Sequence, residues 1–229
     1  MDDLLSPRGL SGRTLTRFDL IAFVGGSPQT VVDCDLEEAD LSGFDLTTWR
    51  FKRCNLRKAD CSGANLERSV WQSCRAPFVS FVGANLSEAA FSGGDFNNST
   101  WRRATLTSAR YVGTKLTGAD FSEARAMDVR FEEVLLVSAK LPGFSFRKET
   151  LRRVDFSGAD VRKSDFRMTV FEDCSLRDAI VAGSRFEGSD LRGADLGGVR
   201  LGGAGLFPRA TISREKAGQL LGGLGLNVL

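Results

Sequence analysis

Large apolar residues recur at every fifth position through most of the chain, and this period constrains the fold more than any other feature. Steps of five from residue 36 to residue 206 visit 35 positions, and 27 of them are Leu or Phe. Leu and Phe make up 44 of the 229 residues, so chance would place about 7 of them there. None of the remaining eight positions holds a charged residue. The period is therefore a property of the fold and not of composition.

A second column of residues lies two positions before the first. It holds Ala, Ser, Thr, Cys, Gly or Val at 31 of 35 places, and its exceptions are Phe44, Trp49, Phe144 and Glu149. The segment 39–43, Ala-Asp-Leu-Ser-Gly, shows the unit clearly. Each unit consists of a small residue, a polar residue, Leu or Phe, a polar residue, and a polar residue or Gly.

A period of five matches neither the 3.6-residue helix nor the two-residue alternation of a strand. A solenoid explains it, because a five-residue unit can form one short side of a coil together with a corner. Both apolar columns then point inward, and the other three residues face water. Neighbouring coils would pair as parallel strands about 4.8 Å apart, which satisfies the main-chain polar groups.

The repeated unit resembles the pattern A(D/N)LXX of the pentapeptide-repeat family, over roughly residues 31–206. That resemblance implies an all-β fold, a right-handed quadrilateral parallel β-helix with four units, or twenty residues, in each coil. We expect three regions: an N-terminal coil and cap (1–30), the β-helix (31–208), and a C-terminal helix with a dimerisation tail (209–229). The repeats are expected to keep one register from residue 36 to residue 206.

The N-terminal segment has a different phase. Leu10, Leu15 and Leu20 lie one residue out of the main register, so an insertion must follow them. We predict an imperfect first coil and then a loop near residues 24–30, built on the turn-forming run Gly25, Gly26, Ser27, Pro28 and Gln29. A loop on a rigid scaffold is a candidate binding element, and a surface insertion without function is the alternative.

The chain changes character after Pro208. Residues 211–221 are predicted to form a short helix, with Ser213 as its N-cap. Its apolar face and the extended segment after it supply a candidate dimer interface: Ala217, Leu220, Leu221, Leu224, Leu226 and Val228. A simple cap over the last coil is the alternative. We favour dimerisation, because the apolar content exceeds what a short cap needs.

The run from Ala217 to Leu229 is similar to the ending of the Qnr proteins, a group of pentapeptide-repeat proteins that also includes MfpA. This resemblance implies a homodimer joined through its C-terminal tails. It also implies a protein that imitates duplex DNA, binds DNA gyrase or topoisomerase IV, and protects the enzyme from a poison. Antibiotic resistance or self-immunity would be the biological purpose.

Charge is the second requirement for imitating DNA. The chain carries 31 basic and 29 acidic residues, so it cannot form a uniformly anionic cylinder. Sorting the outward positions by a twenty-residue phase gives one mildly acidic side, with seven acidic and five basic residues. The candidate residues that face a topoisomerase come from this side: Asp155, Asp178 and Asp195.

The residues that enzymes need are scarce. The chain has no His, which removes the commonest general base and metal ligand, and it has no Gly-rich phosphate loop, CxxC motif or nucleophile elbow. We therefore expect no enzymatic activity and no cofactor. Cys34, Cys54, Cys74 and Cys174 share one twenty-residue phase. They form either a metal or redox site or, as we favour, small residues of the core, because a straight ladder cannot surround an ion.

The beginning MDDLLSPRGLSG lacks the basic and apolar regions of a secretory signal, and no run of about 18 apolar residues exists. These observations favour a cytoplasmic protein with no membrane partner. The short basic pairs have no aromatic residues between them, so we expect no direct binding to nucleic acid. The alternative to topoisomerase protection is a non-enzymatic interaction scaffold with another partner.

Overall fold

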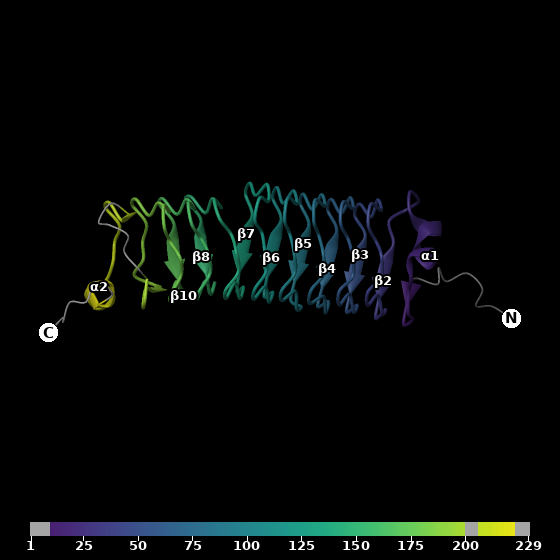
Figure 1. Cartoon of the computed structure of the whole chain (residues 1–229), viewed down its shortest axis with the longest axis horizontal. Helices are drawn as coiled ribbons and strands as arrows, with labels where there is room; N and C mark the ends of the chain where they lie inside the picture. Colours follow the sequence, from purple (N-terminus) through teal and green to yellow (C-terminus); the bar gives the residue numbers. More distant parts are fainter. Residues whose placement is uncertain (1–9, 200–205, 223–229) are drawn as a thin grey trace.

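The chain forms a rod of stacked coils whose long axis runs from the N-terminal to the C-terminal end (Figure 1). The computed structural model describes residues 10–199 and 206–222. One side of the rod is a parallel sheet in which each strand pairs with the next along the chain. Its strands are β1 (Leu10–Ser11), β2 (Thr30–Val32), β3 (Arg50–Lys52), β4 (Val70–Gln72), β5 (Ala90–Ser92), β6 (Arg110–Val112), β7 (Arg130–Glu132), β8 (Thr150–Arg152) and β9 (Val170–Glu172).

Each coil has four sides, because a ladder of single bridges runs along each of the other three. The bridges Asp35↔Asn55, Asp40↔Asp60 and Asp45↔Asn65 follow one another at five-residue steps, and each joins residues twenty apart. Strand pairing in the sheet has the same twenty-residue offset, as between β3 and β4. Near the C-terminal end one ladder becomes a second small sheet of β10 (Cys174–Ser175) and β11 (Ala194–Asp195). The predicted four-sided parallel β-helix is confirmed.

The corners explain the last position of the five-residue unit. The residue there takes a left-handed conformation, as Gly43 does with a φ of 66°. Glycine adopts this conformation without strain, whereas a bulky side chain does so at a cost of about 1–3 kcal/mol. Thr48 and Phe78, both with a φ of 62°, occupy the same kind of corner.

The interior holds both predicted columns. The aromatic residues of one column stack face to face from coil to coil: Phe51 on Trp71 at 4.3 Å between ring centroids, and Phe91 on Tyr111 at 4.8 Å. The indole N–H of Trp71 donates a hydrogen bond of 2.9 Å to the Ser69 hydroxyl, which belongs to the small column. The two columns therefore fill the core and satisfy its polar atoms together.

The N-terminal coil is one residue longer than the repeat, as its phase predicts: Leu10 pairs with Val31, at an offset of 21. Helix α1 (Arg17–Leu20) and the 3-10 helix η1 (Ile21–Phe23) lie at this end of the rod (Figure 1). The guanidinium of Arg17 lies 4.2 Å from the ring centroid of Phe44, and it also bonds to Asp40 at 3.1 Å. This end of the rod is thereby capped.

The expected single register up to residue 206 is wrong at its end. Leu176 still bonds to Asp195 in the regular pattern, but Phe186 stacks on Phe207 and not on Leu206, at 4.8 Å between centroids. One residue is therefore added between Leu196 and Phe207, and this shift moves Phe207 into the large column.

Helix α2 (Arg214–Gly222) follows, and Ser213 caps it by accepting a hydrogen bond from the N–H of Lys216 at 3.2 Å. Within the described ranges no helix has the length and apolarity to span a bilayer.

Candidate protein interface

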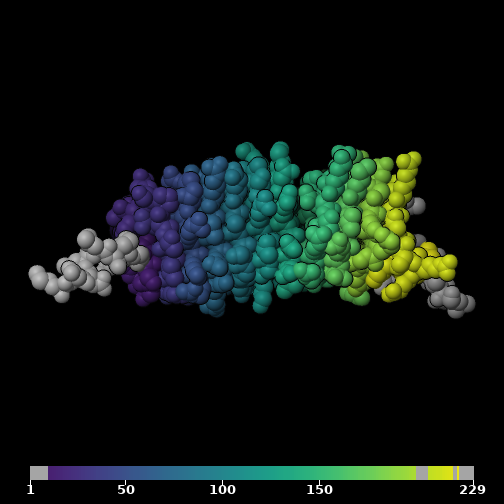
Figure 2. Space-filling view, turned by 180° about the vertical axis from the view of Figure 1, so that it is seen from behind, coloured from purple at the N-terminus to yellow at the C-terminus, as the bar shows by residue number. Residues whose placement is uncertain are grey.

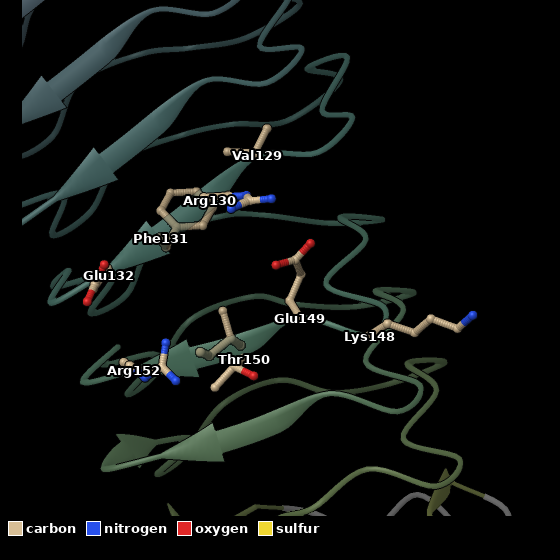
Figure 3. A pocket seen from close by; sticks show the side chains of 9 residues that line it. Val129, Arg130, Phe131, Glu132, Lys148, Glu149, Thr150 and Arg152 are labelled. Carbon is tan, nitrogen blue, oxygen red and sulfur yellow. The ribbon is translucent and has the colours of Figure 1, made fainter.

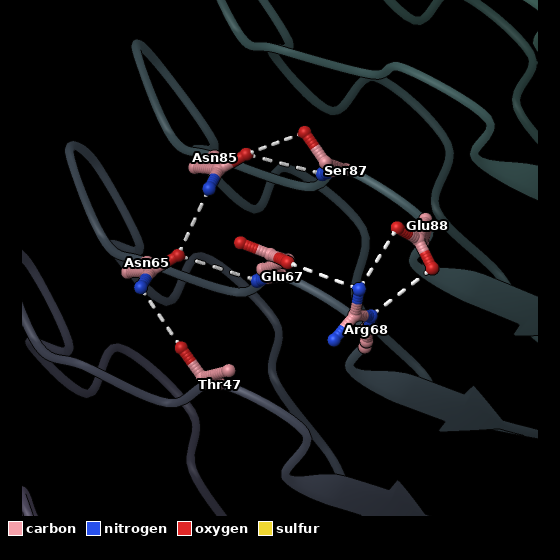
Figure 4. A network of polar contacts seen from close by, with 7 residues as sticks. All are labelled: Thr47, Asn65, Glu67, Arg68, Asn85, Ser87 and Glu88. Atoms are coloured by element: carbon pink, nitrogen blue, oxygen red, sulfur yellow. Dashed lines mark hydrogen bonds and ion pairs between the residues drawn. The ribbon is translucent and has the colours of Figure 1, made fainter.

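The outward side chains are organised into ladders that follow the coils (Figure 4). The Asn65 side-chain amide donates to Thr47 Oγ1 at 2.8 Å, and the Asn85 amide donates to Asn65 Oδ1 at 3.0 Å. Arg68 and Glu88, also twenty residues apart, form an ion pair at 3.0 Å. Much of the polar surface therefore bonds to equivalent positions on the next coil.

Ion pairs between coils make the surface charge-mixed. Arg53 pairs with Asp33 at 2.6 Å, Arg152 pairs with Glu172 at 2.7 Å, and each pair joins residues twenty apart. The Arg53 guanidinium holds the pKa of Asp33 below its usual value, chiefly through a hydrogen bond. These groups are exposed, so each pair contributes only about 0–1 kcal/mol to stability. Their main effect is to break up any continuous anionic stripe.

Two of the three predicted acidic contact residues are engaged within the rod. Asp155 accepts bonds from the N–H and the hydroxyl of Ser157, at 2.8 and 2.5 Å. Burial raises the pKa of Asp195, but hydrogen bonds from the Gly197 N–H and from Arg177 lower it more, so the net shift is downward. The Asp155 carboxylate therefore stabilises a corner within its own coil, and the Asp195 carboxylate links its coil to Arg177 on the preceding coil.

Asp178 differs from the other two. Its side chain is exposed at a corner with a φ of 56°, and among the described residues it has no hydrogen bond or ion pair. A carboxylate in this state keeps all of its hydrogen-bonding capacity for a partner. Asp178 is therefore the strongest of the three candidates.

The predicted loop of residues 25–29 is exposed at the N-terminal end, apart from the half-buried Gln29. The Gly26 N–H bonds to the Phe23 carbonyl at 3.3 Å, and the Gln29 amide donates to the Ser27 carbonyl at 2.6 Å. Because the Gln29 carbonyl accepts a bond from the Arg50 N–H, at 3.0 Å, the loop rejoins the ladder directly before β2.

The structure does not bring the loop and the acidic residues together. Counting by the twenty-residue coil, the loop and Asp155 are half a turn out of phase, so they lie on opposite sides of the rod. They also lie toward opposite ends of it (Figure 1). One flat partner surface cannot contact both.

The predicted dimer interface falls partly within the described residues. Ala217 lies half-buried on α2, and Leu221 is 38% exposed. Leu224, Leu226 and Val228 lie outside the described residues, and the Leu220 side chain does too. The exposed Leu221 leaves apolar surface at the end of the rod.

The cysteines of the shared phase are buried and free. Their thiols donate to main-chain carbonyls, as Cys174 does to Glu172 at 3.4 Å. Burial raises the pKa of Cys174, so this thiol stays protonated at neutral pH. The pKa of Cys61, which is buried outside this phase, is raised for the same reason. They behave as small core residues.

Sequence reasoning missed a cavity of about 320 Å³ between β7 and β8. Its lining includes Arg130, Glu132, Lys148, Glu149 and Arg152 (Figure 3). The signal was available, because Glu149 is the one charged residue in the small inward column.

Two family models match the chain. One, described as a pentapeptide repeat region, matches residues 44–121, and the other, described as pentapeptide repeats (8 copies), matches residues 130–167 and 169–205. A comparison with curated proteins found no match.

Solved structures also align with the rod. A trypsin-treated variant of QnrB1, a plasmid-mediated fluoroquinolone resistance protein, aligns over 96% of this chain and 97% of its own, with a TM-score of 0.54 and 19% identity. Full-length QnrB1 aligns over 95% and 97%, with a TM-score of 0.38 and 18% identity. HetL from the cyanobacterium Nostoc sp. strain PCC 7120, involved in regulating heterocyst differentiation, covers 81% of this chain and 86% of its own, with a TM-score of 0.38 and 20% identity.

Proposed function

Because the chain belongs to the pentapeptide-repeat family, we propose that it is a non-enzymatic, cytoplasmic binding protein that protects a type II topoisomerase from a poison. The partner is DNA gyrase or topoisomerase IV. The observation that carries the proposal is the alignment with a QnrB1 variant along nearly the whole length of both chains. The similarity of the tail from Ala217 onward to the Qnr ending adds to it.

The shape of the rod supports imitation of a duplex, but its charge supports only a local imitation. Duplex DNA carries one negative charge per about 1.7 Å of its axis, whereas this surface alternates cations and anions between coils. We therefore assign the contact to the mildly acidic side, with Asp178 making the direct bond and with Asp155 and Asp195 shaping the surface around it.

The functional unit in this proposal is a homodimer joined through α2 and the tail. The interface comprises Ala217, Leu220, Leu221, Leu224, Leu226 and Val228. The exposed Leu221 supports this assignment, because pairing two copies would remove its apolar surface from water. A dimer would also double the length of rod presented to the topoisomerase.

The test is a DNA cleavage assay with gyrase and with topoisomerase IV, each trapped by several poisons. We expect near-stoichiometric protein to reduce trapped cleavage by one of these poisons. Asp178→Lys should weaken the protection at least tenfold. The matched control is Glu187→Lys, which reverses an exposed charge on the opposite side of the rod and should leave protection unchanged.

Failure of the protein to relieve cleavage, and to inhibit supercoiling at high excess, would contradict the proposal. The charge-mixed surface would then favour an interaction scaffold with a different partner.

A further inference from the structure

Among the regular coils that the structure describes between residues 30 and 199, the main-chain ladder is interrupted at one place, which we call the seam: residues 123–131 facing residues 142–150. One coil earlier, the N–H groups of Arg125 and Arg130 bond to the carbonyls of Ala104 and Ala109, at 2.8 and 3.0 Å. Across the seam, the equivalent bonds from Ser145 and Thr150 are absent among the described residues.

The ladder is intact on both sides of the seam and at both of its ends. The next coil bonds normally, with the Val170 N–H donating to the Glu149 carbonyl at 2.9 Å. Phe121 and Lys140 close one end of the seam, and the pair Glu132↔Arg152 closes the other. The opening is therefore a local feature of one interface between coils. It is visible as the wider space between β7 and β8, and as a notch between the teal and green parts of the surface (Figures 1 and 2).

Three residues explain why the coils part here. Glu149 stands in the inward small column, where a carboxylate enclosed without a partner would be very costly, so the coil leaves it half-buried with access to water. Phe144 is too large for the same column, and Ala126 is too small for the large column. Phe44 holds the position of Phe144 at the start of the rod, where no regular coil precedes it. The coil of Phe144 and Glu149 is thus built like the first coil of a stack.

The opening holds the cavity of about 320 Å³, close to the space of ten water molecules. Glu149 points into it from the β8 side, toward Arg130 on β7 (Figure 3). The charged lining has both signs, with Arg130, Lys148 and Arg152 against Glu132 and Glu149. A mixed lining suits neither a phosphate backbone nor a bare cation.

The lips of the seam are unpaired strand edges. The Val129 carbonyl and the Ala126 N–H face the seam from the coil of β7, and the N–H groups of Ser145 and Thr150 face it from the coil of β8. Unpaired edges that alternate donors and acceptors are the template on which an extended peptide adds as a strand. The main-chain amides of an extended peptide have the same spacing as these groups, because the peptide and the segments that border the seam are both extended chains.

We propose that the seam binds a short extended peptide segment of a partner protein through main-chain hydrogen bonds. A segment of about three residues spans roughly 10 Å. The cavity volume leaves space for a backbone with small side chains such as Gly, Ala, Ser or Thr. The seam lies on the same side of the rod as the loop of residues 25–29, and so opposite the acidic side that holds Asp178. The proposal does not depend on the partner being a topoisomerase.

The test uses the full-length protein and an array of acetylated, amidated pentapeptides that carry Gly, Ala, Ser or Thr at every position. We expect a subset to bind, and solution titration of these peptides should give saturable binding. Methylating alternate main-chain nitrogens of a binding peptide should weaken it at least tenfold, because this removes the N–H donors. A pocket that recognises side chains alone would not discriminate in this way.

Two further measurements use the protein itself. Glu149→Ser restores a small residue to the inward column, lets the lips approach each other, and should weaken peptide binding at least tenfold. Glu187→Ser removes an exposed carboxylate away from the seam and should change nothing. In hydrogen exchange, the amides of Ala126, Ser145 and Thr150 should exchange fast in the free protein and slowly with peptide bound.

The proposal would be overturned by any of three results. These are an array with no binding peptide, binding that tolerates N-methylation, and slow exchange of the seam amides in the free protein. The N-methylated peptides test the wild-type chain, so the proposal remains open to refutation even if Glu149→Ser fails to fold.

Discussion

Replacing Tyr111 with Phe should stabilise the rod. The Tyr111 ring is fully buried, stacked between Phe91 at 4.8 Å and Phe131 at 5.1 Å. Its hydroxyl has no hydrogen-bond partner among the described residues. An unpaired buried hydroxyl costs about 1–3 kcal/mol, and the substitution removes it while keeping every ring contact. We expect a net gain of about 1–2 kcal/mol, after a small loss for the space the hydroxyl leaves.

Urea denaturation followed by circular dichroism measures this gain as a higher midpoint for the coils around Tyr111, and their thermal midpoint should rise with it. Tyr111→Leu is the control, because it keeps an apolar side chain but loses both stacked contacts. Stacked pairs contribute about 0.5–1.5 kcal/mol each, so Tyr111→Leu should destabilise. A Tyr111→Phe variant that is less stable than wild type would refute the reasoning, since the hydroxyl would then have to be hydrogen-bonded in the native state.

A spectroscopic assay checks the same site independently. Burial raises the pKa of Tyr111 well above its usual value, because the phenolate would lose its hydration. The chain has a single Tyr, so absorbance of the phenolate near 295 nm reports this residue alone. We expect no ionisation at pH values near 10 while the protein stays folded. Ionisation there without loss of structure would show that the ring is accessible to water.

Four other substitutions test the rest of the description. Phe121→Asp should prevent folding, because it places a charge in the filled interior, and soluble protein with a normal melting temperature would contradict this. Phe78→Gly should raise the urea midpoint, because it relieves a left-handed corner and removes a half-exposed apolar ring. Leu221→Asp should give a folded monomer by light scattering, whereas a persisting dimer would place the interface elsewhere. The Arg167 guanidinium holds the pKa of Asp165 below its usual value, so this pair stabilises the fold above the unfolded pKa of about 4 and loses the effect as pH falls through the folded pKa. The destabilisation by Asp165→Asn should therefore be largest at neutral pH and shrink on acidification, and a difference independent of pH would contradict the assignment.

The fold was predictable from the sequence because every five-residue unit buries a large and a small residue at the same two positions. Leu116 and Ala119 show it, since a large and a small residue recur at fixed spacing, and a coil built of whole five-residue units puts every copy inside. The number of units in a coil followed only from the resemblance to the pentapeptide-repeat family. The helix near the C-terminus was predictable for a local reason, the cap that Ser213 supplies. Such features depend on neighbours in sequence or on a strict period.

What could not be predicted depends on the irregular positions. Leu206 and Phe207 are adjacent and both are large and apolar, so the five-residue pattern alone could place either of them in the large column. Only the stacking of Phe207 on Phe186 reveals the one-residue shift. The opening beside Glu149 arises from several misfit residues acting together, and a column count records them only as exceptions. The engagement of Asp155 and Asp195 within the rod likewise needs coordinates, because acidic residues at corners and at interfaces have the same sequence signature.

The seam also bears on how the rod folds and comes apart. In a linear array each coil is held only by the coils on either side, so the stability of the array is a sum of coil terms and nearest-neighbour terms. Where one neighbour term is small, the array loses its cooperativity. The coils from β2 to β7 and the coils from β8 onward then become two folding units joined in series. Heat or force acting on the rod would separate these units before unravelling either, and synthesis would complete the first unit before the second is begun.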